Sequence, residues 1–389
     1  MLVAVVSTAL GCAGADSSQI GPENDEGDLQ VSSQALTSPG FGSVAWEELT
    51  PTPAGGTLAN LKASLPLLQG RDIALVLHWP STKLADAARW DIVNDARARG
   101  IRVFPWVTLP NGSAADNLPG ASNYAKTGYF PNDTNYAEWI AKAKELMAMW
   151  RARGLPPTTM SVDLEMRKNR LHQFAEMTGN GAPLDQIEAL LRQGINPTRW
   201  QAARAAFKKF VDEAHAQGFK VNMTTLLPML DDFVDDDADL RQAFGVPLEN
   251  PPLTSSSIQW DEISFQVQRT LYGENFPNVT SYFVLDYGRL ARLLFGARAG
   301  VGLGLTHGGI SNTAPLYPNG TELRLDVQAA LKAGVPSAKI GVYSFLGMYN
   351  RTPTTQWFQA PQSSIGPGLD LGTGLVHGSF WTLDGLLDD

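Results

Sequence analysis

Thr159-Met-Ser-Val-Asp-Leu-Glu-Met166 is the stretch that decides the fold. Its apolar residues fall on one side of an extended chain, and Ser161, Asp163 and Glu165 fall on the other. Residues i and i+2 of a strand share a face, so both carboxylates point the same way. Two neighbouring acids near a strand end can shift each other's pKa, as acid–base chemistry requires. A solvated edge strand is the alternative interpretation of this pattern.

Strand-like and helix-like segments alternate on both sides of this stretch. The predicted strands span residues 42–48, 72–79, 102–109, 159–165, 219–226, 260–268, 301–307 and 339–345. Apolar residues at helical spacing predict helices over 83–99, 135–153, 197–217, 281–296 and 323–334. Asn135 and Asn196 are expected to cap the second and third of these helices, and Pro197 suits a first helical position.

Eight strands interleaved with helices predict a single (β/α)8 barrel over residues 41–389, with a Gly/Pro-rich C-terminal tail at 352–389. The segment 42–48 has the weakest strand pattern, and without it a doubly wound open sheet becomes the alternative. The strands 219–226 and 260–268 alternate between apolar and polar residues. A parallel strand of an open sheet is covered on both faces and would be apolar on both, so the polar face favours the barrel.

In such a barrel the carboxyl ends of the strands converge on one site. Glu165 and Asp163 are the predicted catalytic pair there, because glycan hydrolysis typically uses two carboxylates. Amides and hydroxyls match the hydrogen-bonding groups of a sugar, and aromatic faces stack on sugar rings. The residues predicted to bind substrate are His78, Trp79, Trp106, Asn222, Gln266, Gln268 and Tyr343.

Ser-Val-Asp-Leu-Glu at the end of a fourth barrel strand resembles the Asp-x-Glu ending of the family-18 glycoside hydrolases, the chitinase group, and is similar to that of the family-25 lysozymes. The family-18 resemblance implies that Glu165 protonates the leaving oxygen beside Asp163. The longer family signature has acids where this chain has Thr158 and Ser161. The family also has Tyr at the end of strand six and Trp on strand eight, where this chain has glutamines and Tyr343.

The N-terminus resembles the signal of a bacterial lipoprotein. A short apolar run at residues 2–10 precedes Gly11 and Cys12, as in a lipobox with lipid attached to the cysteine. The predicted organisation is a signal over 1–12 with lipidation at Cys12, followed by a flexible tether over 13–40. This places the protein in the bacterial cell envelope, lipid-anchored or secreted, with the lipid as its link to the membrane.

The net charge of −9 and a pI of about 5.1 disfavour a nucleic-acid partner, whose phosphates require a basic surface. A neutral glycan suits this charge better. We expect a monomer that needs no cofactor.

Two alternatives to the hydrolase remain open. One is a non-catalytic glycan-binding or structural lipoprotein with a degenerate hydrolase barrel. The other is a metal-dependent hydrolase using His78, Asp163, Glu165 and His307. A run of aspartates at 231–239 has oxygen ligands suited to Ca²⁺ but lacks the spacing of an EF-hand loop. We interpret this run as a solvated loop and predict no metal site.

Overall fold

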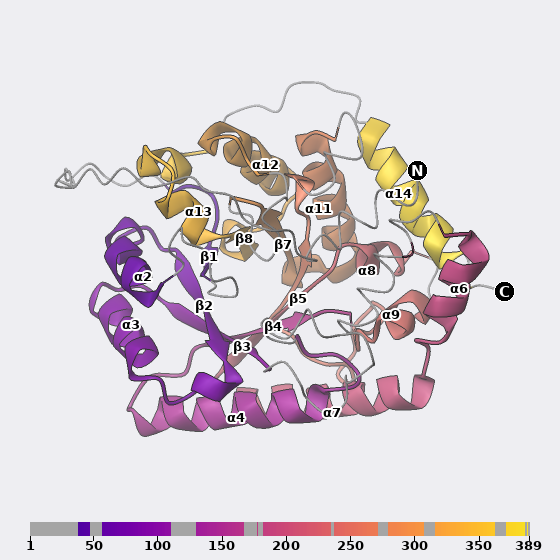
Figure 1. The fold of residues 1–389 in the computed structure, drawn as a ribbon, viewed down its shortest axis with the longest axis horizontal. Helices are drawn as coiled ribbons and strands as arrows, with labels where there is room; N and C mark the ends of the chain where they lie inside the picture. The colour runs from indigo at the N-terminus through magenta and orange to yellow at the C-terminus, as the bar shows by residue number, and fades with distance from the viewer. Residues whose placement is uncertain are drawn as a thin grey trace.

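The computed structural model describes residues 38–46, 57–109, 130–166, 177, 182–234, 237–270, 279–306, 316–361, 371–385 and 387. Eight parallel strands form a closed barrel in sequence order, because β1 pairs with both β2 and β8 (Figure 1). The strands are β1 Ser43–Trp46, β2 Ala74–Pro80, β3 Val103–Thr108, β4 Thr159–Leu164, β5 Lys220–Thr225, β6 Glu262–Gln266, β7 Ala299–Gly304 and β8 Ile340–Tyr343. The predicted barrel is confirmed, and the open sheet is excluded.

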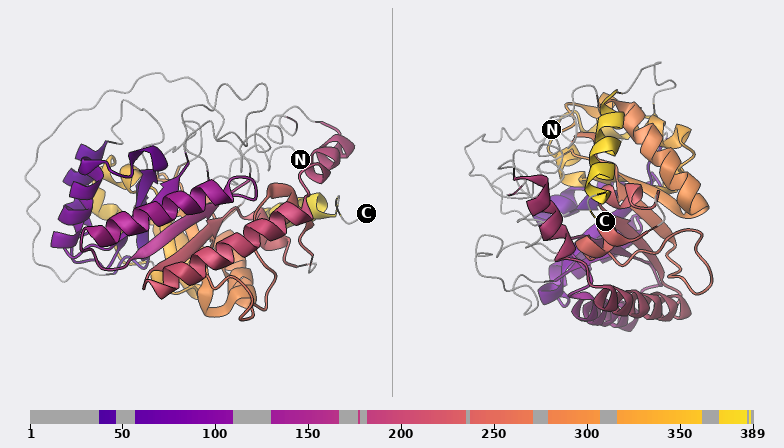
Figure 2. Two further views of the ribbon diagram at one scale, coloured as in Figure 1. Left: turned by 90° about the horizontal axis from the view of Figure 1, so that it is seen from below. Right: turned by 90° about the vertical axis from the view of Figure 1, so that its right-hand side faces the viewer.

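Helices surround the barrel. In chain order the α-helices are α2 Leu58–Ser64, α3 Ala87–Ala98, α4 Tyr136–Ala152, α6 Leu184–Arg192, α7 Pro197–Ala216, α8 Pro228–Asp231, α9 Asp239–Phe244, α11 Ser281–Phe295, α12 Gly320–Lys332, α13 Phe345–Tyr349 and α14 Leu371–Asp384. Short 3₁₀ helices lie at Leu65–Leu67, Ser81–Lys83, Gly296–Arg298, Ser337–Lys339 and Thr354–Phe358. The two long helices α4 and α7 lie side by side along one flank (Figure 2, left).

The two faces of β4 differ in burial. Along β4, Met160, Val162 and Leu164 are buried in the hydrophobic core between sheet and helices. Ser161 and Asp163 alternate with them and are only half-buried. The same division holds along β5, whereas on the inward face of β6 Ser264 is buried and Glu262 and Gln266 are half-buried. Apolar packing against the helices therefore fixes which residues face the barrel interior.

Asparagines at the starts of the two long helices have different roles. Asn196 caps α7 as predicted: its side chain accepts a hydrogen bond from the backbone N–H of Arg199, and Pro197 follows it. Asn135 does not cap α4. Its Oδ1 instead accepts the backbone N–H of Asn132, which fixes the turn before the helix.

The predicted C-terminal tail contains regular structure. Residues 371–384 form α14, which packs against α8, α9 and α11 (Figure 2, right). Trp357 is fully buried and anchors this part of the chain, whereas Trp381 of α14 is 53% exposed. Within the described residues, no helix is both long and apolar enough to cross a bilayer. Cys12 and nearly all of the predicted tether lie outside the described residues.

Candidate active site at the carboxyl ends of the strands

The carboxylates of Asp163 and Glu165 are held by one amide. Nε2 of Gln266 donates to Oε1 of Glu165 at 2.8 Å and lies 3.3 Å from Oδ1 of Asp163. The side chain reaches from β6 to β4 above Thr224 of β5, a small residue that pairs in register with Asp163. Because both oxygens are bonded to the same nitrogen, they lie within about 6 Å of each other. The two acids form one local unit, and Gln266 was predicted to bind substrate rather than to position them.

Gln266 orients both acids. An amide has two N–H donors, and it can donate one to each carboxyl group. Because an amide does not titrate, this contact does not depend on the protonation of Gln266 itself. Arg167, the nearest arginine in sequence, lies outside the described residues.

His78 lies across the interior on β2 and is a neutral group. Nε2 of His78 is 2.8 Å from Oγ1 of Thr108, and its ring contacts the edge of Trp106 with centroids 5.4 Å apart. Burial, together with the positive charge of Lys83, lowers the pKa of His78 to about 3. His78 is therefore uncharged at neutral pH and can accept or donate a hydrogen bond as a neutral imidazole.

Trp106 has the orientation that the sequence predicted. It faces the interior in the same phase as Thr108, and its ring stacks on Phe130 with centroids 5.8 Å apart. Neither Nε1 of Trp106 nor Nδ1 of His78 has a hydrogen-bond partner in the described part of the chain. Two buried polar atoms without partners in adjacent side chains are available to a ligand or to ordered water.

Trp79 was wrongly predicted to bind substrate. It is fully buried on the outer face of β2, where its ring packs against Trp90 and Trp150. Its Nε1 donates to the carbonyl of Lys83. Because successive strand residues point to opposite faces, Trp79 must face away from the interior when His78 faces into it.

The side of the barrel formed by β7, β8 and β1 is lined by very small residues. The inward positions are Gly300, Gly302, Gly304, Gly341, Ser43 and Ala45. Barrel interiors are usually filled by branched side chains. Here solvent reaches Ser43, Ala45, Gly302 and Gly341, which are half-buried rather than buried. This side of the interior therefore carries little side-chain volume of its own.

Tyr343 and Gln268 lie beside this glycine-lined wall. Tyr343 pairs in register with Gly304 and is half-buried on the inward face of β8. Carbon atoms of the Gln268 side chain lie 3.3 and 3.4 Å from the position that a Cβ on Gly304 would occupy. A Cβ at position 304 would press on the Gln268 side chain, so Gly304 lets Gln268 lie against the wall without displacement.

Glu262 is an interior carboxyl that the sequence analysis did not select. It begins β6, at the opposite end of the strand from Gln266, and accepts a hydrogen bond from Nδ2 of Asn222 at 2.9 Å. Burial raises its pKa to about 7, and the charge of Lys339 opposes this shift. Asn222 was predicted to bind substrate, but its amide nitrogen is engaged at the barrel floor, an end of this fold that serves stability rather than catalysis.

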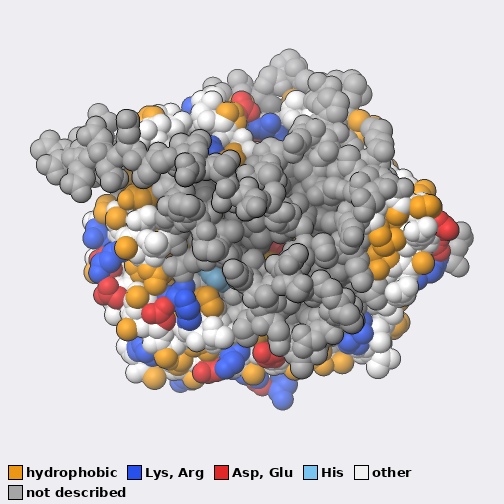
Figure 3. All heavy atoms as spheres, in the orientation of Figure 1, with side chains coloured by type: hydrophobic (Ala, Val, Ile, Leu, Met, Phe, Trp, Pro, Cys, Tyr) orange, Lys and Arg blue, Asp and Glu red, His pale blue; other side chains and the backbone are white. Residues whose placement is uncertain are grey.

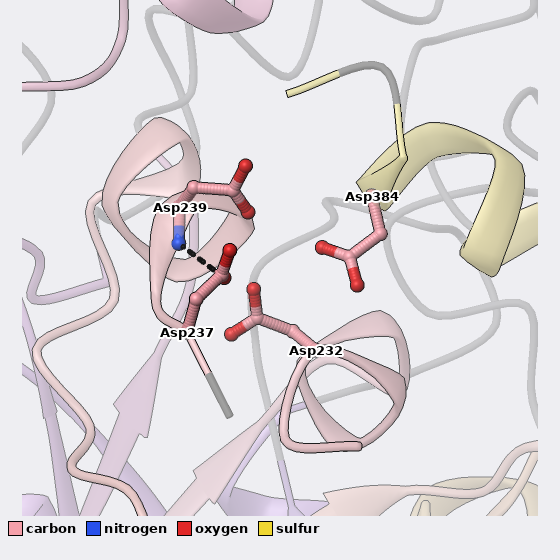
Figure 4. Close-up of side chains that lie close together, drawn as sticks. All are labelled: Asp232, Asp237, Asp239 and Asp384. Atoms are coloured by element: carbon pink, nitrogen blue, oxygen red, sulfur yellow. Dashed lines mark hydrogen bonds between the residues drawn. The ribbon is translucent and has the colours of Figure 1, made fainter. Parts of the chain in front are cut away.

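The metal-dependent alternative finds no support among the described residues. Within the described part of the chain, the acidic side chains that gather closely enough to hold a metal ion are Asp232, Asp237, Asp239 and Asp384, which lie outside the barrel interior (Figure 4). His307, the second histidine of that hypothesis, lies outside the described residues.

The prediction of a solvated loop at 231–239 is wrong for its first part. Asp231 and Asp232 are fully buried. Asp231 accepts hydrogen bonds from Tyr287 and His377, and Asp232 pairs with Arg241. Those partners come from three different helices, which is why the local sequence suggested a solvated run.

No protein-family model and no curated protein matches the chain. Among solved structures, it is similar to a D-psicose 3-epimerase determined in the presence of D-fructose (12% identity, TM-score 0.36, 89% of this chain and 99% of that one). It is also similar to the D-allulose 3-epimerase of Methylomonas sp. (13%, 0.36, 91% and 100%) and to an L-ribulose 3-epimerase (12%, 0.35, 89% and 94%). These neighbours are sugar epimerases rather than chitinases or lysozymes. At this identity and TM-score, they assign no activity or residue role to this chain.

Proposed function

We propose that the protein is a glycoside hydrolase that acts on a neutral glycan, with Glu165 as general acid and Asp163 as its electrostatic partner. The observation that supports this most strongly is the Gln266 amide holding both carboxylates at the carboxyl end of β4. Glu165 protonates the glycosidic oxygen as the bond to the anomeric carbon breaks. The negative charge of Asp163 stabilises the developing positive charge, and water completes the hydrolysis.

The spacing of the acids favours joint action on one side of the sugar. Their bonded oxygens are within about 6 Å, whereas the two carboxyl groups of inverting enzymes lie about 6.5–9.5 Å apart. Oε1 of Glu165 accepts the Gln266 hydrogen bond, so we assign the transferred proton to Oε2. This arrangement agrees with the roles implied by the Asp-x-Glu resemblance.

The environment suits an uncharged sugar. His78, which is neutral, faces the interior together with Trp106 and Tyr343, and aromatic faces of this kind stack on sugar rings. On the face shown in Figure 3, acidic and basic side chains are interleaved along the lower and left edges, so the described charges there do not form a patch of one sign. We further propose attachment to the bacterial cell envelope through lipidated Cys12, with the barrel acting outside the membrane as a monomer.

A specific observation favours a second candidate, a glycan-binding protein without catalysis. Gln266 stands at the strand end where the family-18 resemblance implies Tyr, and it hydrogen-bonds both acids. In that case the barrel binds the same sugars without cleaving them.

One screen separates the candidates. Full-length protein is incubated with a panel of neutral glucans, mannans, xylans and N-acetylhexosamine polymers, and new reducing ends are measured alongside binding. A hydrolase gives reducing ends with at least one polymer, and Glu165→Gln abolishes them. Binding without new reducing ends supports the second candidate, and neither binding nor cleavage rejects both.

A further inference from the structure

Two buried nitrogen atoms on neighbouring strands of the barrel lack a hydrogen-bond partner. Nδ1 of His78 and Nε1 of Trp106 each have less than 1 Å² exposed, and neither is paired in the described part of the chain. The two residues pair in register between β2 and β3, and their rings meet edge to face with centroids 5.4 Å apart. A buried polar atom without a partner costs free energy, which a bound ligand recovers when it supplies that partner.

Trp106 differs from the other buried tryptophans in its surroundings. Four tryptophans packed behind β2 and β3 donate their indole N–H groups to backbone carbonyls, namely Trp79, Trp90, Trp139 and Trp150. Three others that lack an acceptor belong to the hydrophobic core, namely Trp46, Trp260 and Trp357. Trp106 lies outside that core and pairs in register with half-buried Ser161 of β4. Asp163 is the next residue on the same face of β4, so Trp106 lies close to the proposed acids.

Thr108 determines which nitrogen of His78 carries the proton. Oγ1 of Thr108 is fully buried, and its hydrogen-bond partner within the described residues is Nε2 of His78 at 2.8 Å. If Nε2 of the neutral ring carried the proton, both the Thr108 hydroxyl proton and the Nδ1 lone pair would lack partners. If the hydroxyl donates to Nε2 instead, the proton on Nδ1 is the unpaired group. Because each buried unpaired group costs free energy, the proton belongs on Nδ1, which is then a donor.

The turn before α4 holds Trp106 in place. The ring of Phe130 stacks on the Trp106 indole with centroids 5.8 Å apart and an interplanar angle of 6°. The carbonyl of Phe130 accepts hydrogen bonds from Nδ2 of Asn132 at 3.3 Å and Nδ2 of Asn135 at 3.0 Å. Asn135, which does not cap α4, therefore fixes the residue that orients the indole.

We propose that His78 and Trp106 are specificity-determining residues that donate Nδ1–H and Nε1–H to oxygen atoms of a bound neutral sugar. Thr108 is the positioning residue, because its hydroxyl keeps the His78 proton on Nδ1. Hydroxyl, ring and acyl oxygens of a sugar all accept such hydrogen bonds. Two donors on adjacent strands fix the orientation of the sugar beside the acids of β4. This role depends on the glycan site proposed above and not on cleavage.

The first measurement needs no sugar. In full-length protein with isotope-labelled histidine, long-range proton–nitrogen spectra show which ring nitrogen of His78 carries the proton. We expect a proton on Nδ1 in wild type and in Thr108→Ser, and a mixture of both tautomers in Thr108→Val, which has no hydroxyl. A proton on Nε2 of the wild-type ring would overturn the proposal.

The second measurement follows binding to the wild-type protein. Cellotetraose, mannotetraose, xylotetraose and tetra-N-acetylchitotetraose are titrated separately, with calorimetry for affinity and nuclear magnetic resonance for the His78 and Trp106 nitrogen signals. We expect both signals to move with each oligosaccharide that binds. An oligosaccharide that binds and leaves either signal unmoved would overturn the proposal while the glycan site stands. If none of the four binds, the proposed function fails and the recognition role fails with it, whichever tautomer is found.

Variants separate recognition from folding. Trp106→Phe and Thr108→Val should each weaken affinity for the oligosaccharide that binds by about 3- to 10-fold, as expected for one hydrogen bond, and Thr108→Ser should stay within about twofold of wild type. Thr158→Val is the matched control and should keep wild-type affinity, because it removes a threonine hydrogen bond to the carbonyl of Val103 at the amino end of the strands. Equal affinity in Thr108→Val and Thr158→Val would contradict the positioning role. The wild-type spectra decide even if a variant does not fold.

Discussion

Nε2 of Gln266 lies 2.8 Å from Oε1 of Glu165 and connects the end of β6 to the end of β4. A glutamine at this position can orient the proposed acid without competing for its proton, because an amide does not titrate.

Gln266→Ala should lower kcat about 10- to 100-fold with a smaller change in KM, because the acids lose their common hydrogen-bond donor. Gln266→Glu should be more damaging, since a third carboxylate replaces the donor and repels the pair. Steady-state kinetics on a cleaved glycan would measure both. Equal kcat for wild type and Gln266→Ala would show that the amide does not position the acids.

Glu262 should make the protein less stable as pH rises. The pKa of Glu262 in the folded state, about 7, lies above its usual value of 4.5, so folding favours the protonated carboxyl. The stability that this proton contributes is complete below about pH 4.5 and is lost as the pH rises through 7. Glu262→Gln should match wild type near pH 4.5 and exceed its unfolding free energy by about 1–3 kcal/mol at pH 8, a range that allows for partial solvation. Urea unfolding across this pH range is the measurement. A parallel pH dependence in the two proteins would contradict the assignment.

Thr108→Val should destabilise the fold by about 1–2 kcal/mol, because it removes the hydrogen-bond partner of buried His78 while preserving shape. Nuclear magnetic resonance should show that the His78 imidazole does not titrate between pH 5 and 8, since its pKa is lowered to about 3. A His78 resonance that titrates near pH 6.5 would contradict the neutral imidazole described above.

Trp79 and Trp106 should separate stability from binding. Trp79→Phe loses the bond to the Lys83 carbonyl and packing against two tryptophans, so it should cost about 1–3 kcal/mol of unfolding free energy and leave glycan affinity unchanged. Trp106→Phe loses no hydrogen bond within the described structure and should weaken glycan binding with little loss of stability. Calorimetric unfolding and glycan titration of both variants would measure these effects. If Trp79→Phe weakened glycan binding and Trp106→Phe lowered only the stability, the assignment of Trp79 to the outer face and Trp106 to the inner face would be rejected.

The alternation of apolar and polar residues was enough to predict the barrel and the inward face of β4 and β6. It fixed the phase of Asp163, Glu165 and Gln266 because helix packing requires the opposite face to be apolar. It did not show that Gln266 bonds to both acids, because these contacts join β6 to β4 across β5 and depend on the barrel register. Trp79 was misassigned because its position near a strand end was given more weight than its phase.

Local sequence patterns could not predict contacts between residues that are far apart in the sequence. Asp231 and Asp232 look like a solvated run, yet their partners Tyr287, His377 and Arg241 come from α11, α14 and α9. The helix α14 was also missed, because its glycines and mostly apolar composition give no clear amphipathic pattern, and it is stabilised by packing against α8, α9 and α11.

The most direct test of the central claim is the initial rate of glycan cleavage by Glu165→Gln. Glu138→Gln, which changes an exposed residue of α4, is the matched control. We predict that Glu165→Gln loses at least about 100-fold in rate while it binds glycan with wild-type affinity and melts at a similar temperature, and that Glu138→Gln retains full activity. Glu165→Gln that cleaves glycan as fast as Glu138→Gln would contradict the assignment of the active site.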